Sequence, residues 1–540
     1  MRRRMTPGAL CARFVLLALA GVAGACSDPA PGRPPAAAAV VVPVSAATSP
    51  APTPAPVATD SVGVRFDALS PAAGLALTLA VVGDADGETT FRVPGCCGIA
   101  DAQRFVADVR FALDGQPLPA QRGRTGWTLR HAPRAPLTVS YRLVPSGVLT
   151  IDAGPLDQFR PIVQGDSFQL IGDSALLLPA GRTSTDVVAV TVDATRVADA
   201  AHFASSFAPG NVVERAVVSR TMLGRSLFVG GAVSMQVRDT PSGRIGIVHD
   251  AMDPGVRVQD LHNDVLAIVA AERGFFHDAD PWYLVSLRGG ARRDPDINIG
   301  GGTGLHHALA VFAWSGLDLA HGEQHREQLR WVLAHEYFHN WDGLTLRVAT
   351  DPATRRDDAS AYWFSEGVAE FYTMRLLTRA GLQAPSLSVA VLNDRLRRHA
   401  ANPRRDLELA TAGKRFWTDA DAEQIPYVRG YLAAWQADLA LSRASQGKRS
   451  LDDVVRELVA RARAEPGFRI DNAFLLAYFD RALPAEDAAR MRGFVLRGGD
   501  APLDPASFAP CLAGARERID GRHVVQFRLA DRADASCFRH

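Results

Sequence analysis

The residues with the clearest chemical potential form the pattern His335-Glu336-Tyr337-Phe338-His339. Residues four apart on an α-helix lie one turn above each other, so His335 and His339 can hold the same metal ion. Glu336 would then lie beside that ion, where it can accept a proton from an attacking water. The pattern therefore predicts zinc-assisted hydrolysis, on condition that this segment is helical.

The residues before this pattern support a helix. Leu329, Val332 and Leu333 recur at helical spacing and would bury one of its faces. Two imidazoles nevertheless leave the site one ligand short, because a catalytic zinc ion usually has three protein ligands and a water. The alternative is a buried helix with two incidental histidines, so the prediction depends on a third ligand elsewhere in the chain.

A candidate third ligand lies in the segment Ala361–Tyr372, whose pattern predicts a second helix with Asp358 or Ser360 as its N-cap. Glu366 is this candidate. Glu370 lies one turn further along the same face, where it can hydrogen-bond the outer nitrogen of a ligand histidine. The alternative is that both carboxylates lie on the surface of the helix. We favour the metal site, because an acidic pair in an aromatic-rich segment fits a buried position better.

Two blocks of the sequence, HEYFHNWDG and YWFSEGVAEFY, resemble the glycyl aminopeptidase family of gluzincin zinc metallopeptidases. The pattern of that family is HExFHxWN, followed by WxSEG with an acidic residue four positions after the ligand glutamate. A third block, from Tyr427 to Gly430 with GKRSLDD downstream, resembles the YxKG segment of the family. Three blocks in the same order argue against chance similarity.

The resemblance implies a thermolysin-like catalytic domain with one zinc ion per chain, held by His335, His339 and Glu366. It also implies that Tyr427 donates its hydroxyl to the oxyanion formed during peptide hydrolysis. For Tyr427 the alternative is a packed aromatic residue on a helix. The implied activity is removal of small N-terminal residues from peptide or protein substrates. We do not expect the PDZ module that many members carry, because too few residues follow Asp500.

The Gly-rich segment Gly300–His307 lies where the family carries a GGLEH-like substrate-binding strand, so Gly304 and His306 are candidate substrate contacts. The glutamate of that strand is expected to pair with the amino terminus of the substrate, and His306 stands in its place. A neutral imidazole can only accept one hydrogen bond from an amine, and a protonated one repels it. This predicts weak selectivity for a free N-terminus, weaker still as the pH falls through the imidazole pKa. The alternatives are a neighbouring carboxylate or an alignment shifted by one residue.

The N-terminus has the pattern of an export signal. A basic stretch, Met1–Met5, precedes the apolar run Phe14–Ala25, which is too short to span a membrane. The small residues before Cys26 fit a bacterial lipoprotein signal in which this cysteine is lipidated, and ordinary signal peptidase cleavage is the alternative. Residues 1–25 are thus predicted to be a signal peptide and 26–60 a Pro/Ala-rich tether. The expected location is the periplasm or the outer membrane of a bacterium.

The rest of the chain divides by pattern into four parts. Residues 61–250 contain short apolar runs broken by Gly, Pro and Asp, which predict a β-sandwich-like domain. Residues 251–400 hold the zinc pattern and form the expected catalytic domain. Helical patterns dominate residues 401–500, and 501–540 form a tail. The predicted fold class is therefore multidomain α+β with a helical C-terminal region.

Composition and cysteine usage restrict the partners. The chain has 540 residues, of which 47% are hydrophobic and 22% charged, as in a globular protein. A formal net charge of +1 gives no reason to expect nucleic acid, and membrane contact is expected only through a lipid on Cys26. The pairing of Cys96 and Cys97 stays open, and a bridge between Cys511 and Cys537 is a candidate in an oxidising compartment.

The sequence as a whole predicts an exported zinc-dependent aminopeptidase. One alternative is an endopeptidase or a peptidase of altered specificity on the same site, because of His306. Another is a peptide-binding protein that has lost catalysis. The intact set of His335, Glu336 and His339 argues against this last alternative, because a decayed enzyme has no chemical need of a general base. The physiological substrate and the oligomeric state are not predicted.

Overall fold

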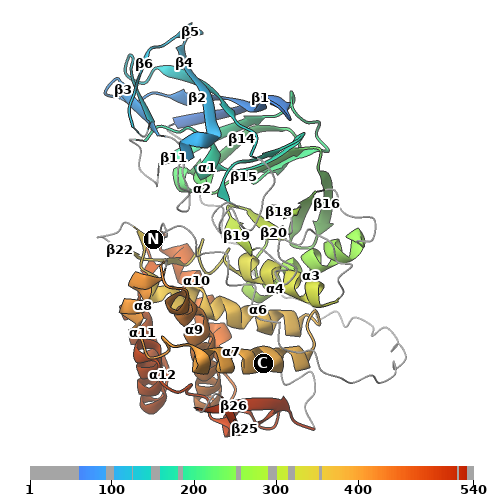
Figure 1. Ribbon diagram of the computed structural model, residues 1–540, viewed down its shortest axis with the longest axis vertical. Helices are drawn as coiled ribbons and strands as arrows, with labels where there is room; N and C mark the ends of the chain where they lie inside the picture. Colours follow the sequence, from blue (N-terminus) through green and yellow to red (C-terminus); the bar gives the residue numbers. More distant parts are fainter. Residues whose placement is uncertain are drawn as a thin grey trace, which may run out of the picture.

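The computed structural model describes residues 60–92, 102–124, 126–146, 159–180, 186–250, 257–289, 301–313, 323–351, 356–416, 418–519 and 522–531. Three parts follow one another along the long axis of the molecule (Figure 1). The first is rich in strands, the second combines one sheet with the helices of the candidate site, and the third is helical. The predicted multidomain α+β class is confirmed.

Two sheets form the N-terminal part. In spatial order the larger consists of β14 (Val212–Ser219), β11 (Val187–Asp193), β1 (Asp60–Ser70), β2 (Gly74–Val82), β8 (Pro136–Leu143), β4 (Val106–Leu113) and β5 (Gln116–Pro117). The smaller consists of β13 (Ala208–Pro209), β12 (Phe203–Ser205), β15 (Leu227–Gly231), β10 (Ser167–Ile171) and β9 (Ile162–Gln164). Shorter elements complete this part: α1 (Gly172–Ala175), α2 (Arg220–Gly224) and a three-stranded sheet of β3 (Glu88–Arg92), β7 (Gly126–Arg130) and β6 (Ala120–Arg122).

The core of this part lies between the two larger sheets. Alternate residues of β1, among them Val64 and Phe66, are buried, as expected for a strand with one face against another layer. The ring of Phe66 stacks on that of Phe168 in the opposite sheet, with 5.3 Å between their centroids. The predicted β-sandwich-like domain is therefore confirmed.

The central sheet consists, in spatial order, of β16 (Ser234–Thr240), β17 (Gly243–His249), β18 (Trp282–Gly289), β20 (Ala308–Ala313) and β19 (Gly301–Leu305). Strands β17 and β18 are parallel, and α3 (Val258–Phe276) connects them. The strands β16 and β17 precede the expected domain boundary at residue 251 but pair within this sheet. The layer that carries the site therefore begins earlier than expected.

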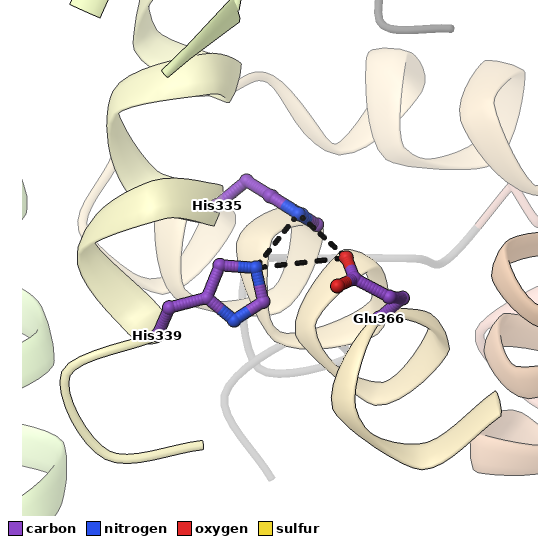
Figure 2. A group of neighbouring side chains, drawn as sticks. All are labelled: His335, His339 and Glu366. Carbon is purple, nitrogen blue, oxygen red and sulfur yellow. Dashed lines mark hydrogen bonds and ion pairs between the residues drawn. The ribbon is translucent and has the colours of Figure 1, made fainter. Parts of the chain in front are cut away.

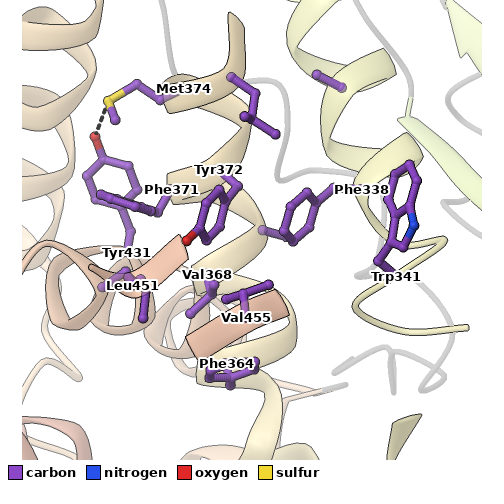
Figure 3. Packing of buried hydrophobic residues seen from close by; sticks show 14 of the residues in the cluster. Phe338, Trp341, Phe364, Val368, Phe371, Tyr372, Met374, Tyr431, Leu451 and Val455 are labelled. Carbon is purple, nitrogen blue, oxygen red and sulfur yellow. Dashed lines mark hydrogen bonds between the residues drawn. The ribbon is translucent and has the colours of Figure 1, made fainter. Parts of the chain in front are cut away.

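Helices α4 (Glu323–Phe338), α5 (Tyr362–Ser365) and α6 (Gly367–Arg379) follow the central sheet, together with two short strand pairs, β21 (Arg347–Val348) with β24 (Arg469–Ile470) and β22 (Thr350–Asp351) with β23 (Arg356–Asp357). Side chains from these helices and from the C-terminal part share one core (Figure 3). Within it, the rings of Phe338 on α4 and Tyr372 on α6 stack with 5.1 Å between centroids. This packing fixes α6 against α4.

The C-terminal part consists of α7 (Pro385–Ala401), α8 (Leu409–Arg415), α9 (Ala420–Ala444), α10 (Leu451–Ala464), α11 (Asn472–Ala482), α12 (Ala485–Arg497) and a hairpin of β25 (Leu512–Ile519) and β26 (Arg522–Leu529). A capping box of Ser450 and Asp453 begins α10. The hairpin is anchored on α7, because Asn393 exchanges two hydrogen bonds of 2.7 Å with the backbone of Phe527.

Several expectations concern residues outside the described ranges. They are the signal peptide, Cys26, all but the last residue of the tether, and Cys96, Cys97 and Cys537. Cys511 is disulfide-bonded, whereas its expected partner Cys537 lies outside the described residues. Among the helices described, none has the length and apolar character needed to cross a membrane.

Candidate metal centre and active site

Helix α4 presents both histidines of the pattern on one face (Figure 2). The Nε2 atoms of His335 and His339 lie 3.2 Å apart, and their rings are perpendicular. Leu329 and Val332 of the same helix are buried, as their spacing predicts. The core therefore holds α4 in an orientation that points both imidazoles toward α6.

Glu366 lies at the junction of α5 and α6 and not inside one continuous helix, as the sequence suggested. Asp358 caps the preceding turn by accepting a hydrogen bond of 2.9 Å from the backbone N–H of Ser360. The Oε2 atom of Glu366 lies 3.4 Å from Nε2 of His335 and 3.6 Å from Nε2 of His339. The structure thus brings the three predicted ligands together.

The three donor atoms fit a zinc ion in number, type and spacing. All lie within 4.8 Å of one another, and they are two imidazole nitrogens and a carboxylate oxygen. Ligands about 2.0–2.1 Å from a tetrahedral zinc ion are about 3.4 Å apart. The observed separations of 3.2, 3.4 and 3.6 Å bracket this value. The group can therefore hold one zinc ion, with a fourth position left for water or substrate.

The electrostatics of the group favour a cation. Burial raises the pKa of Glu366, but the neighbouring His339 and His335 outweigh it and hold this pKa well below its usual range. Burial likewise opposes a charge on His339, yet the carboxylate of Glu366 raises its pKa to about 10. The carboxylate is therefore ionised and stabilises positive charge between the imidazoles, which is the place that a metal cation would take.

Outer contacts orient both histidines. Nδ1 of His339 donates a hydrogen bond of 2.8 Å to the backbone oxygen of Asp342. Nδ1 of His335 faces Oε1 of Glu370 at 3.5 Å, which is longer than an ordinary hydrogen bond. Such contacts at Nδ1 leave Nε2 free to bind a metal. Glu370 therefore lies behind His335, and its role in orienting that ligand stays a prediction.

Glu336 lies against the edge of the central sheet. Its carboxylate accepts a hydrogen bond from the backbone N–H of Gly304 on β19, and burial raises its pKa. A β-carbon on Gly302 would lie 2.6 Å from Cγ of Glu336, and one on Gly304 would lie 3.3 Å from Cβ of His339. Glycine thus allows the strand to approach α4 closely. The substrate-binding role of Gly304 remains a prediction, and its place beside Glu336 is compatible with that role.

Tyr427 projects from α9 toward the metal centre. Its ring is half-buried, and its centroid lies 6.5 Å from that of His335, with the two planes 30° apart. On its other side it faces the ring of Phe416 at 6.3 Å. Tyr427 thus lies beside the predicted ligands, as a donor to the oxyanion must.

His306 does not lie with His335, His339 and Glu366. It begins the tight turn between β19 and β20, and its backbone N–H donates a hydrogen bond of 2.9 Å to the oxygen of Arg225. Its side chain lines a separate cavity of about 230 Å³ together with Arg273, Tyr337 and Asn340. Burial and the neighbouring His307 lower its pKa to about 3. The imidazole is therefore neutral at ordinary pH, and the expected loss of selectivity through its protonation does not apply there.

Sequence reasoning missed three buried charged residues around the site. Arg395 of α7 forms an ion pair with Glu370, and no pattern in the sequence connects these two. Asp342 is buried, its pKa is raised to about 7 by burial, and it stands where the pattern of the family has asparagine. Glu423 is buried one helical turn before Tyr427. Its spacing of four residues from Tyr427 could have indicated that both side chains lie on one face of α9.

Comparisons with known proteins agree with this geometry. Residues 328–428 match the model of the M61 glycyl aminopeptidase family. A search of curated proteins finds no significant match. Among solved structures, an aminopeptidase N family protein from Idiomarina loihiensis aligns with a TM-score of 0.67 and 16% identity, over 85% of this chain and 79% of that one.

Two further structures have a similar coverage. A two-domain M1 zinc metallopeptidase mutant bound to L-arginine has a TM-score of 0.50 and 16% identity, over 83% of this chain and 95% of that one. An M1 zinc metallopeptidase from Deinococcus radiodurans has a TM-score of 0.48 and 15% identity, over the same shares. The family match and the predicted ligand set together identify the protein as a zinc metallopeptidase, and its segment 328–428 is similar to the M61 glycyl aminopeptidase family.

Proposed function

We propose that this metallopeptidase is an exported aminopeptidase that removes small residues from the free N-terminus of peptides. The observation that carries the proposal is that the side chains of His335, His339 and Glu366 lie close enough together to hold one metal ion. Glu336 follows His335 directly on helix α4. The match of the segment around these residues to a glycyl aminopeptidase family supports the preference for small N-terminal residues.

The residues of the chain can be given distinct roles in peptide hydrolysis. When bound, zinc would supply Lewis-acid catalysis, which polarises the scissile carbonyl and makes the attacking water more acidic. Glu336 accepts a proton from this water as its oxygen bonds to the carbonyl carbon. The same proton then passes to the leaving nitrogen as the C–N bond breaks. The hydroxyl of Tyr427 donates a hydrogen bond to the oxyanion between these two steps.

Strand β19 is the element that would position the substrate. It is the last strand of the central sheet in the described part of the chain, and it pairs with β20 on one side. An extended peptide can add to such an edge through backbone hydrogen bonds. Glu336 lies against this strand, so a peptide added there would bring a carbonyl close to the general base.

Export is proposed from the N-terminal pattern alone. The basic stretch, the apolar run Phe14–Ala25 and the following Cys26 support a lipoprotein signal. Expression with a radiolabelled fatty acid tests this step. Label in the wild type that is lost in Cys26→Ser supports lipidation. A secreted, unlabelled protein that begins at residue 26 supports ordinary signal peptidase cleavage instead.

The activity is tested with paired peptides that differ only in N-terminal acetylation. We expect the zinc-loaded protein to release single N-terminal residues from the free-amine peptides, and a chelator to abolish this release. Product masses identify the bond that is cleaved. Internal cleavage of both peptides would favour an endopeptidase, and binding without cleavage would favour a peptide-binding protein.

A further inference from the structure

Helix α9 crosses directly over the backbone that carries Glu366. A β-carbon on Gly430 would lie 1.8 Å from the oxygen of Trp363, and one on Gly367 would lie 2.3 Å from Cα of Gly430. No side chain fits between the two backbones at this point. The face of α9 that contains Gly430 is therefore fixed over the junction of α5 and α6, where Glu366 lies.

The same face of α9 continues away from this crossing through Tyr427 and then Glu423. Residues three or four apart on a helix share a face, so the three positions form one stripe. Tyr427 lies beside His335, as described above. Glu423 is placed one turn further, within range of an electrostatic interaction with Glu366. It therefore lies near the carboxylate of Glu366.

The carboxylate of Glu423 is buried, and no side chain of opposite charge among the described residues forms an ion pair with it. The residue is only 2% exposed, and its Oε2 atom makes no hydrogen bond within the described part of the chain. An unpaired carboxylate in such a place is costly, and an incoming cation would relieve the cost.

We propose that Glu423 binds the ammonium group at the N-terminus of the substrate. This inference rests on the proposed aminopeptidase function and names the residue that gives selectivity for a free N-terminus. An ammonium beside a buried carboxylate forms a charge-assisted hydrogen bond, which a neutral acetylated terminus cannot form. Glu423 thereby takes the role that His306, neutral and lining a cavity apart from the three predicted ligands, cannot take.

The alternative is that Glu423 only stabilises the N-terminus of α9, and this alternative predicts different effects of substitution. Acidic residues in the first turn of a helix interact favourably with its dipole, and α9 has two there, Asp421 and Glu423. Asp421 is less buried and provides a matched control. If Glu423 only supports the helix, then Asp421→Asn and Glu423→Gln should have similar effects. If it binds substrate, only Glu423→Gln should alter the response to the N-terminal amine.

The experiment compares wild type, Glu423→Gln, Glu423→Asp and Asp421→Asn, each with its zinc content and thermal midpoint measured. We expect Glu423→Gln to lower kcat/KM for free-amine peptides at least about 30-fold, mainly through KM, without lowering that for acetylated peptides. Glu423→Asp should retain part of the selectivity, because it keeps the charge. An equal loss with both substrates, or no loss, would overturn the proposal.

A second measurement separates this proposal from the proposed activity. Binding of glycinamide to the zinc-loaded protein is measured by calorimetry, which requires no turnover. We expect Glu423→Gln to weaken this binding at least about 30-fold. If the wild type cleaves no peptide but shows this difference, the activity fails and the amine site stands. Equal binding to wild type and variant would overturn the amine site, whatever the activity.

Discussion

Arg395 and Glu370 form a buried ion pair directly behind His335. One oxygen of Glu370 contacts the guanidinium of Arg395, and the other faces Nδ1 of His335 at 3.5 Å and accepts a hydrogen bond from Trp331. Burial would raise the pKa of Glu370, but Arg395 and His335 outweigh it and lower this pKa. The carboxylate is thus held ionised, in the state that orients a metal-binding imidazole.

This arrangement predicts different zinc affinities for two carboxylate variants. Glu366→Ala leaves two imidazoles, so the protein should purify largely without zinc. Glu370→Ala keeps all three ligands and should weaken zinc binding only about 10- to 100-fold. Competition with a chromophoric chelator measures both affinities. A larger loss in Glu370→Ala than in Glu366→Ala would show that the two carboxylates have been assigned the wrong way round.

The crossing of α9 over α6 predicts a strong effect at Gly430. In Gly430→Ala the added methyl group meets the backbone oxygen of Trp363, so the helices must separate and Glu366 must shift. We expect a loss of about 1–3 kcal/mol in the free energy of unfolding and weaker zinc binding. Urea unfolding and chelator competition measure the two effects.

Gly274→Ala is the matched control for this substitution. Gly274 is an exposed residue of α3, and an added β-carbon there meets nothing within 4 Å. Because alanine is the better helix former, this variant should gain up to about 1 kcal/mol. Similar behaviour of the two variants would contradict the close contact between α9 and the α5–α6 junction.

The group of three candidate metal ligands could be predicted because it depends on short segments of the sequence. The spacing of His335 and His339 requires only the period of a helix, and Glu366 lies in a second compact block with its own aromatic pattern. Tyr427 followed from a third short block. Each of these residues is found without knowing how distant segments pack.

Other features depend on contacts between distant segments, which a periodic pattern does not contain. The pairing of Arg395 with Glu370 requires the position of α7 relative to α6. The strands β16 and β17 are short runs with apolar residues, like the strands of the sandwich, so the sequence does not indicate which sheet they join. The turn after β19 carries His306 into a separate cavity, and its motif alone gives no sign of this.

The stability of the helical part should depend on pH through His399. This residue is buried on α7, and its Nε2 donates a hydrogen bond of 2.7 Å to the oxygen of Gly499. Burial lowers its pKa to about 4. Between pH 6.5 and 4 the unfolded chain therefore binds a proton that the folded chain does not. The free energy of unfolding should fall by roughly 3 kcal/mol over this range and be unaffected above it.

The contribution of His399 is isolated by substitution. His399→Gln keeps a hydrogen-bond donor but does not titrate, so its urea midpoint should fall less between pH 7 and 4.5 than that of the wild type. His523→Gln, at an exposed position of the C-terminal hairpin, serves as the control and should follow the wild type. Parallel pH profiles for wild type and His399→Gln would contradict the assignment.

The proposed hydrolysis depends on Glu336 acting as the general base beside a zinc ion held by His335, His339 and Glu366. The most direct measurement is the turnover of Glu336→Gln with its zinc content determined in the same sample. Because the ligands are unchanged, we predict that the variant binds one zinc ion per chain. Its turnover should be lower than that of the wild type by about 10²- to 10⁴-fold or more. Turnover equal to that of the wild type in the zinc-loaded variant would contradict the mechanism.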